Sequence, residues 1–219
     1  MTHHADTLTE PRVQAALRRM FEEAGQDDAV ASRIDWGSGT ASMSPQEHAD
    51  AAAEIYMPIS AAGGELLYSL VRAVRPDTVV EFGMSYGIST LYLAAAVRDN
   101  GAGRVVTTEL SKEKIAAARR TFADTGLDDL ITVLEGDARD RLGGLDAPAG
   151  FVLLDGWKDL CLPVLKLLEP RLAPGTLVVA DDTSFASMRP YLDYVRDPAN
   201  GYRNVAFPVE DGMEISCRL

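Results

Sequence analysis

The stretch that most constrains the fold is VVEFGMSYGIST, at residues 79–90. Two β-branched residues lead into Glu81, Gly83 and Gly87 follow, and the alanine-rich run after Gly87 has the composition of a helix. A strand that enters a glycine-bearing turn and then a helix is typical of nucleotide-binding α/β folds, because the helix N-terminus presents unpaired N–H groups at the carboxyl end of the strand. We therefore expect a polar or anionic ligand at this turn.

The turn lacks the glycines of a dinucleotide site. The GxGxxG fingerprint needs a second glycine for close approach to a pyrophosphate and a third for helix packing, but Ser85 stands at the second position and the third has no glycine either. A carboxylate at Glu81 would repel a phosphate, whereas it would attract the ammonium group of S-adenosylmethionine. The turn therefore favours S-adenosylmethionine over a dinucleotide. A tight turn with no ligand is the alternative.

Length, composition and charge limit the class of protein. The 219 residues, 47% of them hydrophobic and 25% charged, are ordinary for one globular domain. A net charge of −12 argues against a nucleic-acid partner, and the densest basic cluster, Lys112, Lys114, Arg119 and Arg120, is expected on a solvated face. No membrane-spanning or signal segment is evident, which favours no membrane partner and a cytoplasmic location. The two cysteines lack metal-ligand spacing and are expected to be reduced.

Strands and helices are expected to alternate from residue 77 onward. Strands are expected at 77–82, 104–109, 130–135, 150–155, 175–181, 202–208 and 212–218. Helices are expected at 87–98, 112–124, near 138–143, 159–172 and 187–197. The last two strands flank Asp211–Gly212, a hairpin signal. This order predicts an α/β fold with a doubly wound, mostly parallel, seven-stranded sheet whose last strand is antiparallel.

The N-terminal part is expected to add accessory helices to the same domain. Residues 1–56 contain helical patterns and a glycine- and serine-rich stretch at 35–44 that we interpret as a mobile loop. Residues 57–219 contain the ligand-binding sheet. Helical patterns in the first 75 residues are expected at 10–24, 45–56 and 61–75.

Acidic residues at the ends of the first strands indicate an adenosine site. Glu81 and Glu109 end the first two predicted strands, at the rim where open α/β sheets bind their ligands. A carboxylate at Glu109 can accept hydrogen bonds from both hydroxyls of a ribose. Asp137, after the third strand, is expected to reach the adenine edge, to cap the following helix, or to do both.

A second group of acidic residues indicates a metal site. Asp155 ends the fourth strand and Asp181 and Asp182 end the fifth, so three carboxylates are expected to converge. Hard oxygen ligands of this kind suit Mg²⁺, although Asp182 could instead cap a helix. Lys158 lies close to these ligands and beside Trp157. Burial and a nearby cation would disfavour its charged form, which makes Lys158 a candidate general base.

The segments LLDGWKDLCLP and LVVADD, together with the turn at 79–90, resemble the catechol O-methyltransferase family of class I S-adenosylmethionine-dependent methyltransferases, over roughly residues 55–219. The resemblance implies a Rossmann-like methyltransferase domain at 57–219. It also implies Mg²⁺-dependent methyl transfer to a hydroxyl of a small molecule, such as a catechol or another vicinal-diol-like phenol, by a monomer or a homodimer.

The resemblance also implies roles for individual residues. Lys158 matches the catalytic base, and Asp155, Asp181 and Asp182 match the metal ligands. Glu81, Ser89 and Glu109 match contacts to the methionine and ribose ends of the cofactor. The whole set expected around S-adenosylmethionine is Met57, Ile59, Glu81, Gly83, Ser85, Gly87, Ser89, Glu109, Leu110, Asp137, Ala138, Asp155 and Trp157.

The chain departs from the family at two positions. Asp182 stands where the family commonly has asparagine, and no acidic residue lies near Val205, where the mammalian enzymes hold the second catechol hydroxyl. Two other classes of protein are alternatives. An NAD(P)-dependent oxidoreductase would use the same type of sheet but needs the missing glycines. A non-catalytic protein that binds an adenosyl ligand would need neither the three aspartates nor Lys158.

Overall fold

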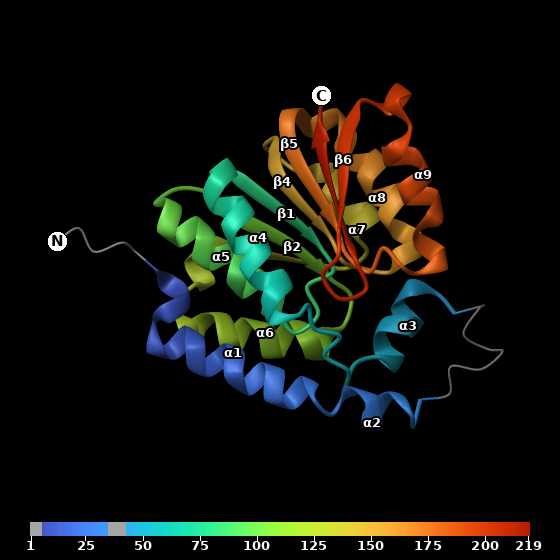
Figure 1. The fold of residues 1–219 in the computed structure, drawn as a ribbon. Helices are drawn as coiled ribbons and strands as arrows, with labels where there is room; N and C mark the ends of the chain where they lie inside the picture. The colour runs from blue at the N-terminus through green and yellow to red at the C-terminus, as the bar shows by residue number, and fades with distance from the viewer. Residues whose placement is uncertain (1–5, 35–42) are drawn as a thin grey trace.

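The central sheet has seven strands in the order β3-β2-β1-β4-β5-β7-β6 within residues 6–34 and 43–219, the part of the chain that the computed structural model describes (Figure 1). The strands are β1 (Thr78–Phe82), β2 (Arg104–Glu109), β3 (Ile131–Glu135), β4 (Ala149–Leu154), β5 (Leu172–Ala180), β6 (Tyr202–Phe207) and β7 (Met213–Arg218). Neighbouring strands from β3 to β5 are parallel, and β7 is antiparallel to both β5 and β6. The predicted doubly wound, mostly parallel α/β sheet is confirmed.

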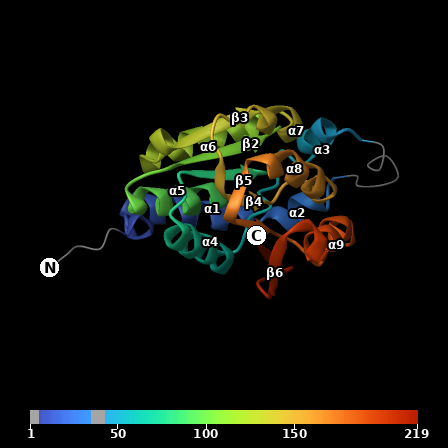
Figure 2. The same ribbon diagram turned by 90° about the horizontal axis from the view of Figure 1, so that it is seen from above.

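Helices cover both faces of this sheet (Figure 2). They are α1 (Pro11–Ala24), α2 (Asp27–Ala31), α3 (Pro45–Ala51), α4 (Ala61–Val74), α5 (Ile88–Asn100), α6 (Lys112–Thr125), α7 (Ala138–Arg141), α8 (Cys161–Leu168) and α9 (Arg189–Arg196). Successive strand residues point to opposite faces, so Val79 belongs to the core that includes α1, α4, α5 and α6, whereas Val80 belongs to the core that includes α7, α8 and α9. Two hydrophobic cores, one on each face, hold the layers together.

The turn after β1 has the close packing that its glycines suggested. Gly83 and Gly87 both have left-handed backbone, with φ of 95° and 93°. A Cβ at Gly83 would lie 2.5 Å from the backbone nitrogen of Gly156, and one at Gly87 would lie 2.6 Å from the Phe122 ring. The turn therefore lies directly against the segment that follows β4 and against α6.

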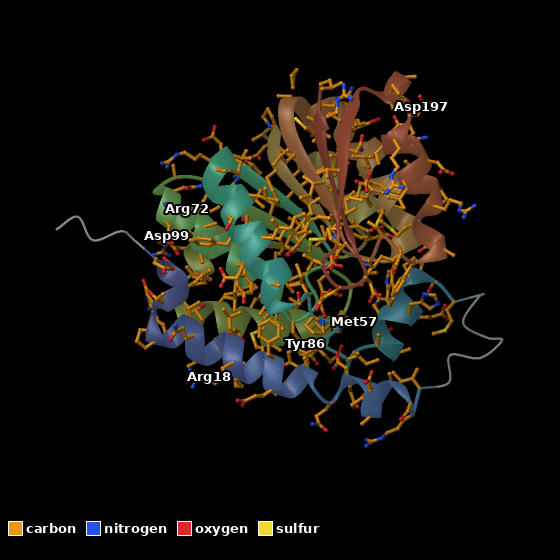
Figure 3. The ribbon with its side chains drawn as sticks, viewed as in Figure 1. Arg18, Met57, Arg72, Tyr86, Asp99 and Asp197 are labelled. Atoms are coloured by element: carbon orange, nitrogen blue, oxygen red, sulfur yellow. The ribbon has the colours of Figure 1, made fainter. Side chains whose placement is uncertain are left out.

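Helix α5, which begins at this turn, is buried along almost its whole length because α4, the 3₁₀ turn at Thr7–Thr9 and β2 all pack around it. Its far end is fixed by Asp99, which is labelled in Figure 3. The Asp99 carboxylate accepts hydrogen bonds from the hydroxyls of Thr7 and Tyr68, each at 2.6 Å. The ligand-binding turn is thus attached to a helix held on several sides.

Several predicted boundaries are wrong, although the elements themselves exist. The helix expected at 45–56 ends at Ala51, after a start fixed by a capping box between Ser44 and Glu47. The helix expected at 159–172 is α-helical only over Cys161–Leu168 and has 3₁₀ turns at both ends. Strand β5 begins at Leu172 rather than at 175, because Leu172 pairs with Ala149 across an irregularity in the register. A Pro-Gly pair here interrupts the pattern but not the strand.

The N-terminal helices pack on the sheet domain and reach the edge where the ligand is expected. Val13 and Leu17 of α1 are buried in the same core as α5 and α6. Helices α2 and α3 lie beyond the carboxyl ends of the parallel strands (Figure 1). Of the loop predicted at 35–44, only residues 43 and 44 fall within the described residues.

Two predictions about chemistry and environment can be compared with the structure. Cys161 is buried, Cys217 is half-buried, and both are free thiols, as predicted. Among the helices in the described ranges, none combines the length and the apolar character that a membrane crossing requires.

Candidate functional site

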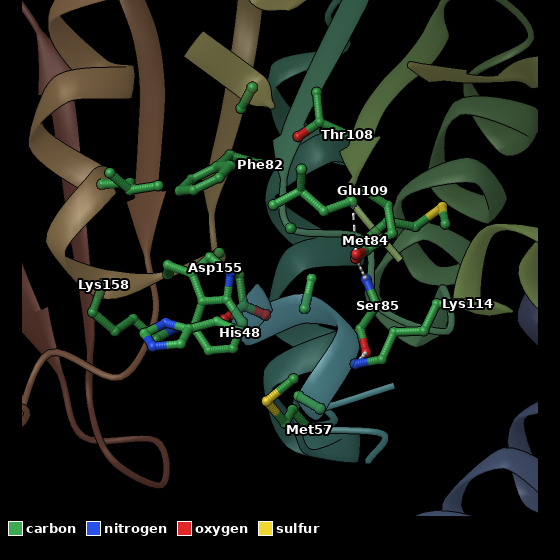
Figure 4. Close-up of a pocket in the computed structure, with 18 of the residues that line it drawn as sticks. His48, Met57, Phe82, Met84, Ser85, Thr108, Glu109, Lys114, Asp155 and Lys158 are labelled. Carbon is green, nitrogen blue, oxygen red and sulfur yellow. Dashed lines mark hydrogen bonds and ion pairs between the residues drawn. The ribbon is translucent and has the colours of Figure 1, made fainter. Parts of the chain in front are cut away.

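A cavity of about 650 Å³ lies at the carboxyl ends of the parallel strands, next to the point where the strand order reverses between β1 and β4. Its wall comes from α3, the segment 56–59, the turn after β1, the ends of β2 and β3, the segment after β4, and the loop after β5. Figure 4 shows how these side chains converge. Open α/β sheets bind ligands at such a reversal, because the adjacent loops separate there.

Most of the predicted site residues line this cavity. They are Met57, Ile59, Gly83, Ser85, Ser89, Glu109, Leu110, Asp137, Ala138, Asp155, Trp157, Lys158 and Asp182. Three predicted residues, Glu81, Gly87 and Asp181, do not line it. Gly87 contributes the left-handed backbone of the turn, and Asp181 is buried with one carboxylate oxygen near those of Asp155 and Asp182.

Glu81, predicted to contact the ligand, does not line the cavity. Glu81 is fully buried, and its carboxylate accepts hydrogen bonds from the hydroxyls of Ser89 (2.6 Å), Thr90 (2.6 Å) and Thr107 (2.5 Å). Glu81 is the second-to-last residue of β1 and pairs with Thr107, so it lies one residue before the end of the strand. Burial raises the pKa of Glu81 to about 7, although the three hydroxyl groups oppose this shift. Glu81 therefore orients Ser89, which does line the cavity.

Glu109 lines the cavity, as predicted. Its carboxylate is already held by three backbone N–H groups at 2.8 Å. One oxygen, Oε1, accepts from Leu110 and Ser111, and the other, Oε2, accepts from Ser85. A carboxylate offers about four acceptor positions, so Glu109 retains one free position, on Oε2, where the prediction assumed enough for both ribose hydroxyls.

Asp137 caps α7, one of the two roles considered for it. Its side chain accepts a hydrogen bond from the Arg139 backbone N–H at 2.8 Å, and the Arg139 guanidinium pairs with it as well. These bonds to Arg139 lower the pKa of Asp137. Because Asp137 also lines the cavity, the capping role leaves an approach to a ligand open.

Asp155, Asp181 and Asp182 converge as predicted. Each offers one carboxylate oxygen, and the three oxygens lie within 4.8 Å of one another. The convergence follows from the pairing of β4 with β5, which ends at Leu154 and Ala180 immediately before these residues. Burial and mutual repulsion raise the pKa of Asp155 and of Asp181. Clustered hard oxygen donors fit a divalent cation such as Mg²⁺.

The alternative that Asp182 is only a helix cap is wrong. The 3₁₀ turn that follows it, Ala186–Met188, has Phe185 at its N-cap position. The Asp182 side chain instead forms an ion pair with Lys158 at 2.9 Å. Its backbone has a φ of 56°, a left-handed conformation that aspartate tolerates better than most residues. Asp182 therefore points its carboxylate toward the cluster.

Lys158 lies between two of these carboxylates. Its Nζ is 2.8 Å from Asp155 and 2.9 Å from Asp182, and its side chain is 13% exposed. Burial alone lowers the pKa of Lys158, but the two carboxylates outweigh burial and raise it above the ordinary value. This direction is opposite to the one expected beside a cation, because the prediction counted burial and a nearby cation and did not include ion pairs to Asp155 and Asp182.

The remaining wall near Lys158 is largely apolar. Trp157, Leu160, Phe185 and Met57 line it, and the His48 ring meets Trp157 edge-on with ring centroids 5.4 Å apart. These are the side chains that an aromatic ligand would contact.

Val205 lies outside this wall. It is 55% exposed on edge strand β6 and does not line the cavity. Glu210, in the turn between β6 and β7, is an acidic residue whose charge helps to raise the pKa of Asp155 and whose carboxylate accepts from the Ser60 N–H at 3.1 Å.

Sequence reasoning missed several residues of the site. Lys114 was expected on a solvated face, yet it is 2% exposed and lines the cavity. His48 and Glu210 belong to segments whose position no local pattern reveals. Tyr56 and Tyr86 stack with ring centroids 4.0 Å apart beside the turn. Of these residues, only Tyr86 could have been placed near the site from the sequence, since it lies between Gly83 and Gly87.

Comparisons with known proteins find similarity to methyltransferases. Residues 80–183 match a family described as a methyltransferase domain. Catechol O-methyltransferase B of zebrafish (Danio rerio) is 29% identical over 231 residues, which cover 98% of this chain and 82% of that protein. Mouse (Mus musculus) catechol O-methyltransferase is 29% identical over 147 residues, 64% of this chain. A probable O-methyltransferase of Mycobacterium tuberculosis is 33% identical over 61% of this chain. The matched regions span 55% of the mouse protein and 60% of the mycobacterial one.

Solved structures share the architecture. The O-methyltransferase TomG of Streptomyces achromogenes, in complex with S-adenosylmethionine, has a TM-score of 0.67 at 20% identity, over 91% of this chain and 98% of that one. The Podospora anserina methyltransferase PaMTH1, bound to S-adenosylhomocysteine, has a TM-score of 0.65 at 21% identity, over 94% and 96%. At such identities the likeness establishes the fold alone, which is the Rossmann-like methyltransferase fold. The methyltransferase-domain match and the sequence relatives support an S-adenosylmethionine-dependent O-methyltransferase that is similar to catechol O-methyltransferases.

Proposed function

We propose that this protein is a Mg²⁺-dependent O-methyltransferase that moves a methyl group from S-adenosylmethionine to a hydroxyl of a small aromatic acceptor. The observation that carries the proposal is one cavity with two chemically different ends. Glu109 and Asp137 line it at the carboxyl ends of β2 and β3, and Asp155, Asp182 and Lys158 line it after β4 and β5, on the other side of β1. An enzyme that transfers a methyl group from a nucleoside-bearing donor to a hydroxyl oxygen needs the donor site and the acceptor site side by side.

The donor is proposed to bind along the turn after β1. Glu109 would accept a ribose hydroxyl at its free position, and Asp137 and Ala138 would lie at the adenine. The other end of the donor carries the amino acid, for which Ser89 and the left-handed turn at Gly83 are the proposed partners. Met57, Ile59 and Trp157 would close the cavity around the middle of the donor, since all three line it.

Asp155, Asp181 and Asp182 are proposed to hold the metal. When bound, Mg²⁺ supplies positive charge that neutralises these carboxylates and makes a neighbouring acceptor hydroxyl easier to ionise. Lys158 would then lose the two ion pairs that raise its pKa, and its Nζ would accept the proton of the acceptor hydroxyl. The acceptor oxygen forms a bond to the methyl carbon, the carbon–sulfur bond breaks, and S-adenosylhomocysteine is released. The donor methyl is already activated, so alignment is the main further contribution of the chain.

The proposed acceptor is a catechol or a similar phenol. The apolar wall of Trp157, Leu160 and Phe185 beside the carboxylates would contact an aromatic ring, and relatives of this chain carry catechol O-methyltransferase in their names. Val205 cannot hold a second hydroxyl from its exposed position on β6.

The decisive experiment measures methyl transfer from labelled S-adenosylmethionine to catechol and to phenols that lack the adjacent hydroxyl. The reaction is run with Mg²⁺, with EDTA, and with Mg²⁺ restored. We expect product from catechol only when Mg²⁺ is present. Product formed in EDTA would refute the metal-dependent reaction. Binding of NADH in place of S-adenosylmethionine, measured by titration calorimetry, would instead favour an oxidoreductase.

A further inference from the structure

Lys114 is a buried cation that the proposed reaction leaves without a role. It lies in the first turn of α6, behind the N-cap residue Ser111, and only 2% of it is exposed. Its Nζ donates a hydrogen bond to the Ser85 hydroxyl at 3.0 Å and lies 5.6 Å from the centroid of the Tyr86 ring. A buried lysine without a strong partner is costly, so an ammonium that lines a ligand cavity calls for a ligand atom or an orienting role.

Ser85 connects Lys114 to the proposed ribose site. The Ser85 hydroxyl accepts from Lys114 and donates to the Tyr56 carbonyl at 2.6 Å, and the Ser85 N–H donates to Glu109 at 2.8 Å. Figure 4 shows the Ser85 side chain directed toward Lys114, with the Ser85 backbone beside Glu109. The ammonium therefore lies on the same side of the cavity as the carboxylate proposed to hold the ribose.

The free hydrogen-bonding positions of Glu109 and Lys114 indicate how these two residues could share the two ribose hydroxyls. With three of about four acceptor positions occupied, Glu109 can take one ribose hydroxyl, and the second hydroxyl needs another partner. An ammonium group has three N–H donors. Within the described ranges Lys114 spends one of them, on Ser85, and two are left for a ligand.

We propose that Lys114 is a cofactor-binding residue, which donates from Nζ to the oxygen of the ribose hydroxyl that Glu109 does not accept. The inference rests on the proposed function, because it takes the Glu109 end of the cavity as the donor site. It assigns ribose recognition to a carboxylate and an ammonium together. In this arrangement a ribose with either hydroxyl missing loses a bond to a charged group.

The charges around Lys114 make the contact sensitive to pH. Glu109 of β2 and Asp27 of α2 face it and favour its charged form, and Tyr86 of the turn lies beside it. Burial outweighs the two carboxylates and lowers the pKa of Lys114 to about 8. Since the charged form donates to the ribose more strongly, donor affinity should be highest below this value and should fall as the pH rises through it.

The test is a coupling experiment by titration calorimetry. The ligands are S-adenosylhomocysteine and its 2′-deoxy and 3′-deoxy analogues, and the proteins are the wild type, Lys114→Met and Lys112→Met. Lys112 is an exposed lysine two residues away on the same helix, so its variant is the matched control. In the wild type we expect each deoxy analogue to bind about tenfold or more weakly. Lys114→Met should bind S-adenosylhomocysteine about tenfold more weakly and be insensitive to loss of one of the two hydroxyls.

A second arm uses the wild type alone and so does not depend on the folding of a variant. Affinity for 5′-methylthioadenosine, which has no group that titrates near pH 8, is measured from about pH 7 to about pH 9.5. The same measurement is made with the 2′-deoxy and 3′-deoxy analogues of 5′-methylthioadenosine. We expect the affinity for 5′-methylthioadenosine to fall above pH 8. The affinity for the analogue that lacks the hydroxyl bound by Lys114 should stay level. Additive losses in the first arm, or the same pH dependence for all three nucleosides, would overturn the inference. A wild type that binds no S-adenosylhomocysteine would overturn the proposed function itself.

Discussion

Replacing Asp182 by asparagine tests the metal site and the base together, because this side chain contacts both. The substitution keeps the shape and removes one negative charge from a cluster whose oxygens lie within 4.8 Å of one another. It also removes one of the two carboxylates that hold Lys158, at 2.9 Å. Before a cation binds, the pKa of Lys158 should fall in this variant, because one of the two carboxylates that raise it has lost its charge. With fewer ligand charges, Mg²⁺ should bind more weakly.

Both effects can be measured on the same protein. Calorimetric titration with Mg²⁺ gives the metal affinity, and the pH–rate profile at saturating Mg²⁺ gives the pH at which the base becomes available. We expect Asp182→Asn to weaken Mg²⁺ binding and to move the rising limb of the profile to lower pH, because a cation with fewer neutralising ligands makes the acceptor hydroxyl easier to ionise. Asp193→Asn, at an exposed position of α9, is the matched control. If Mg²⁺ affinity and the pH profile are both unchanged, the metal site consists of Asp155, Asp181 and water, and the reasoning about Asp182 is refuted.

Three further predictions concern the rest of the site. Glu109→Ala should weaken S-adenosylmethionine binding more than about tenfold, because a bond to a charged group is worth about 1.5–3 kcal/mol; unchanged affinity in calorimetry would remove Glu109 from the donor site. Asp155→Ala should be as inactive with Mg²⁺ as the wild type is in EDTA, and full activity would point to metal-independent transfer. Glu81 has its pKa raised from 4.5 to about 7, so its contribution to stability is present below pH 4.5 and is lost as the pH rises to about 7. Relative to Glu81→Gln, the free energy of unfolding in urea should therefore fall by about 3 kcal/mol over this range, and parallel curves for the two proteins would contradict the shift.

The strands and the metal cluster were predictable for the same reason. Strands β1 and β4 are short buried runs bounded by glycine or acidic residues, and parallel strands of one sheet bring their carboxyl ends to one edge. The meeting of Asp155 with Asp181 and Asp182 follows from strand order alone. Helix ends were less predictable, because the helix expected at 45–56 and the start of β5 depend on pairing and capping with residues elsewhere in the chain.

Individual side chains in the site depended on the fold. Glu81 and Glu109 look equivalent in the sequence, since each ends a predicted strand. Glu81 pairs with Thr107, two residues before Glu109, and this offset buries Glu81 against three hydroxyls and leaves Glu109 facing the cavity. Lys114 looks like its neighbour Lys112, but the helical twist turns one toward Tyr86 and the other toward solvent.

The sequence by itself therefore determined the α/β class, the strand-turn-helix at residues 79–90 and the chemical types gathered at the rim, because these depend on local periodicity and on which residues end each strand. The tertiary structure alone decided which of those groups face the cavity, which partners occupy their hydrogen bonds and how their pKa values move. Lys158 illustrates the difference: its place beside Asp155 could be predicted, but the direction of its pKa follows from two carboxylates that only the packed sheet brings within 3 Å of its nitrogen. Burial and charge pairing are properties of positions in space, and the order of residues along the chain constrains them only through the fold.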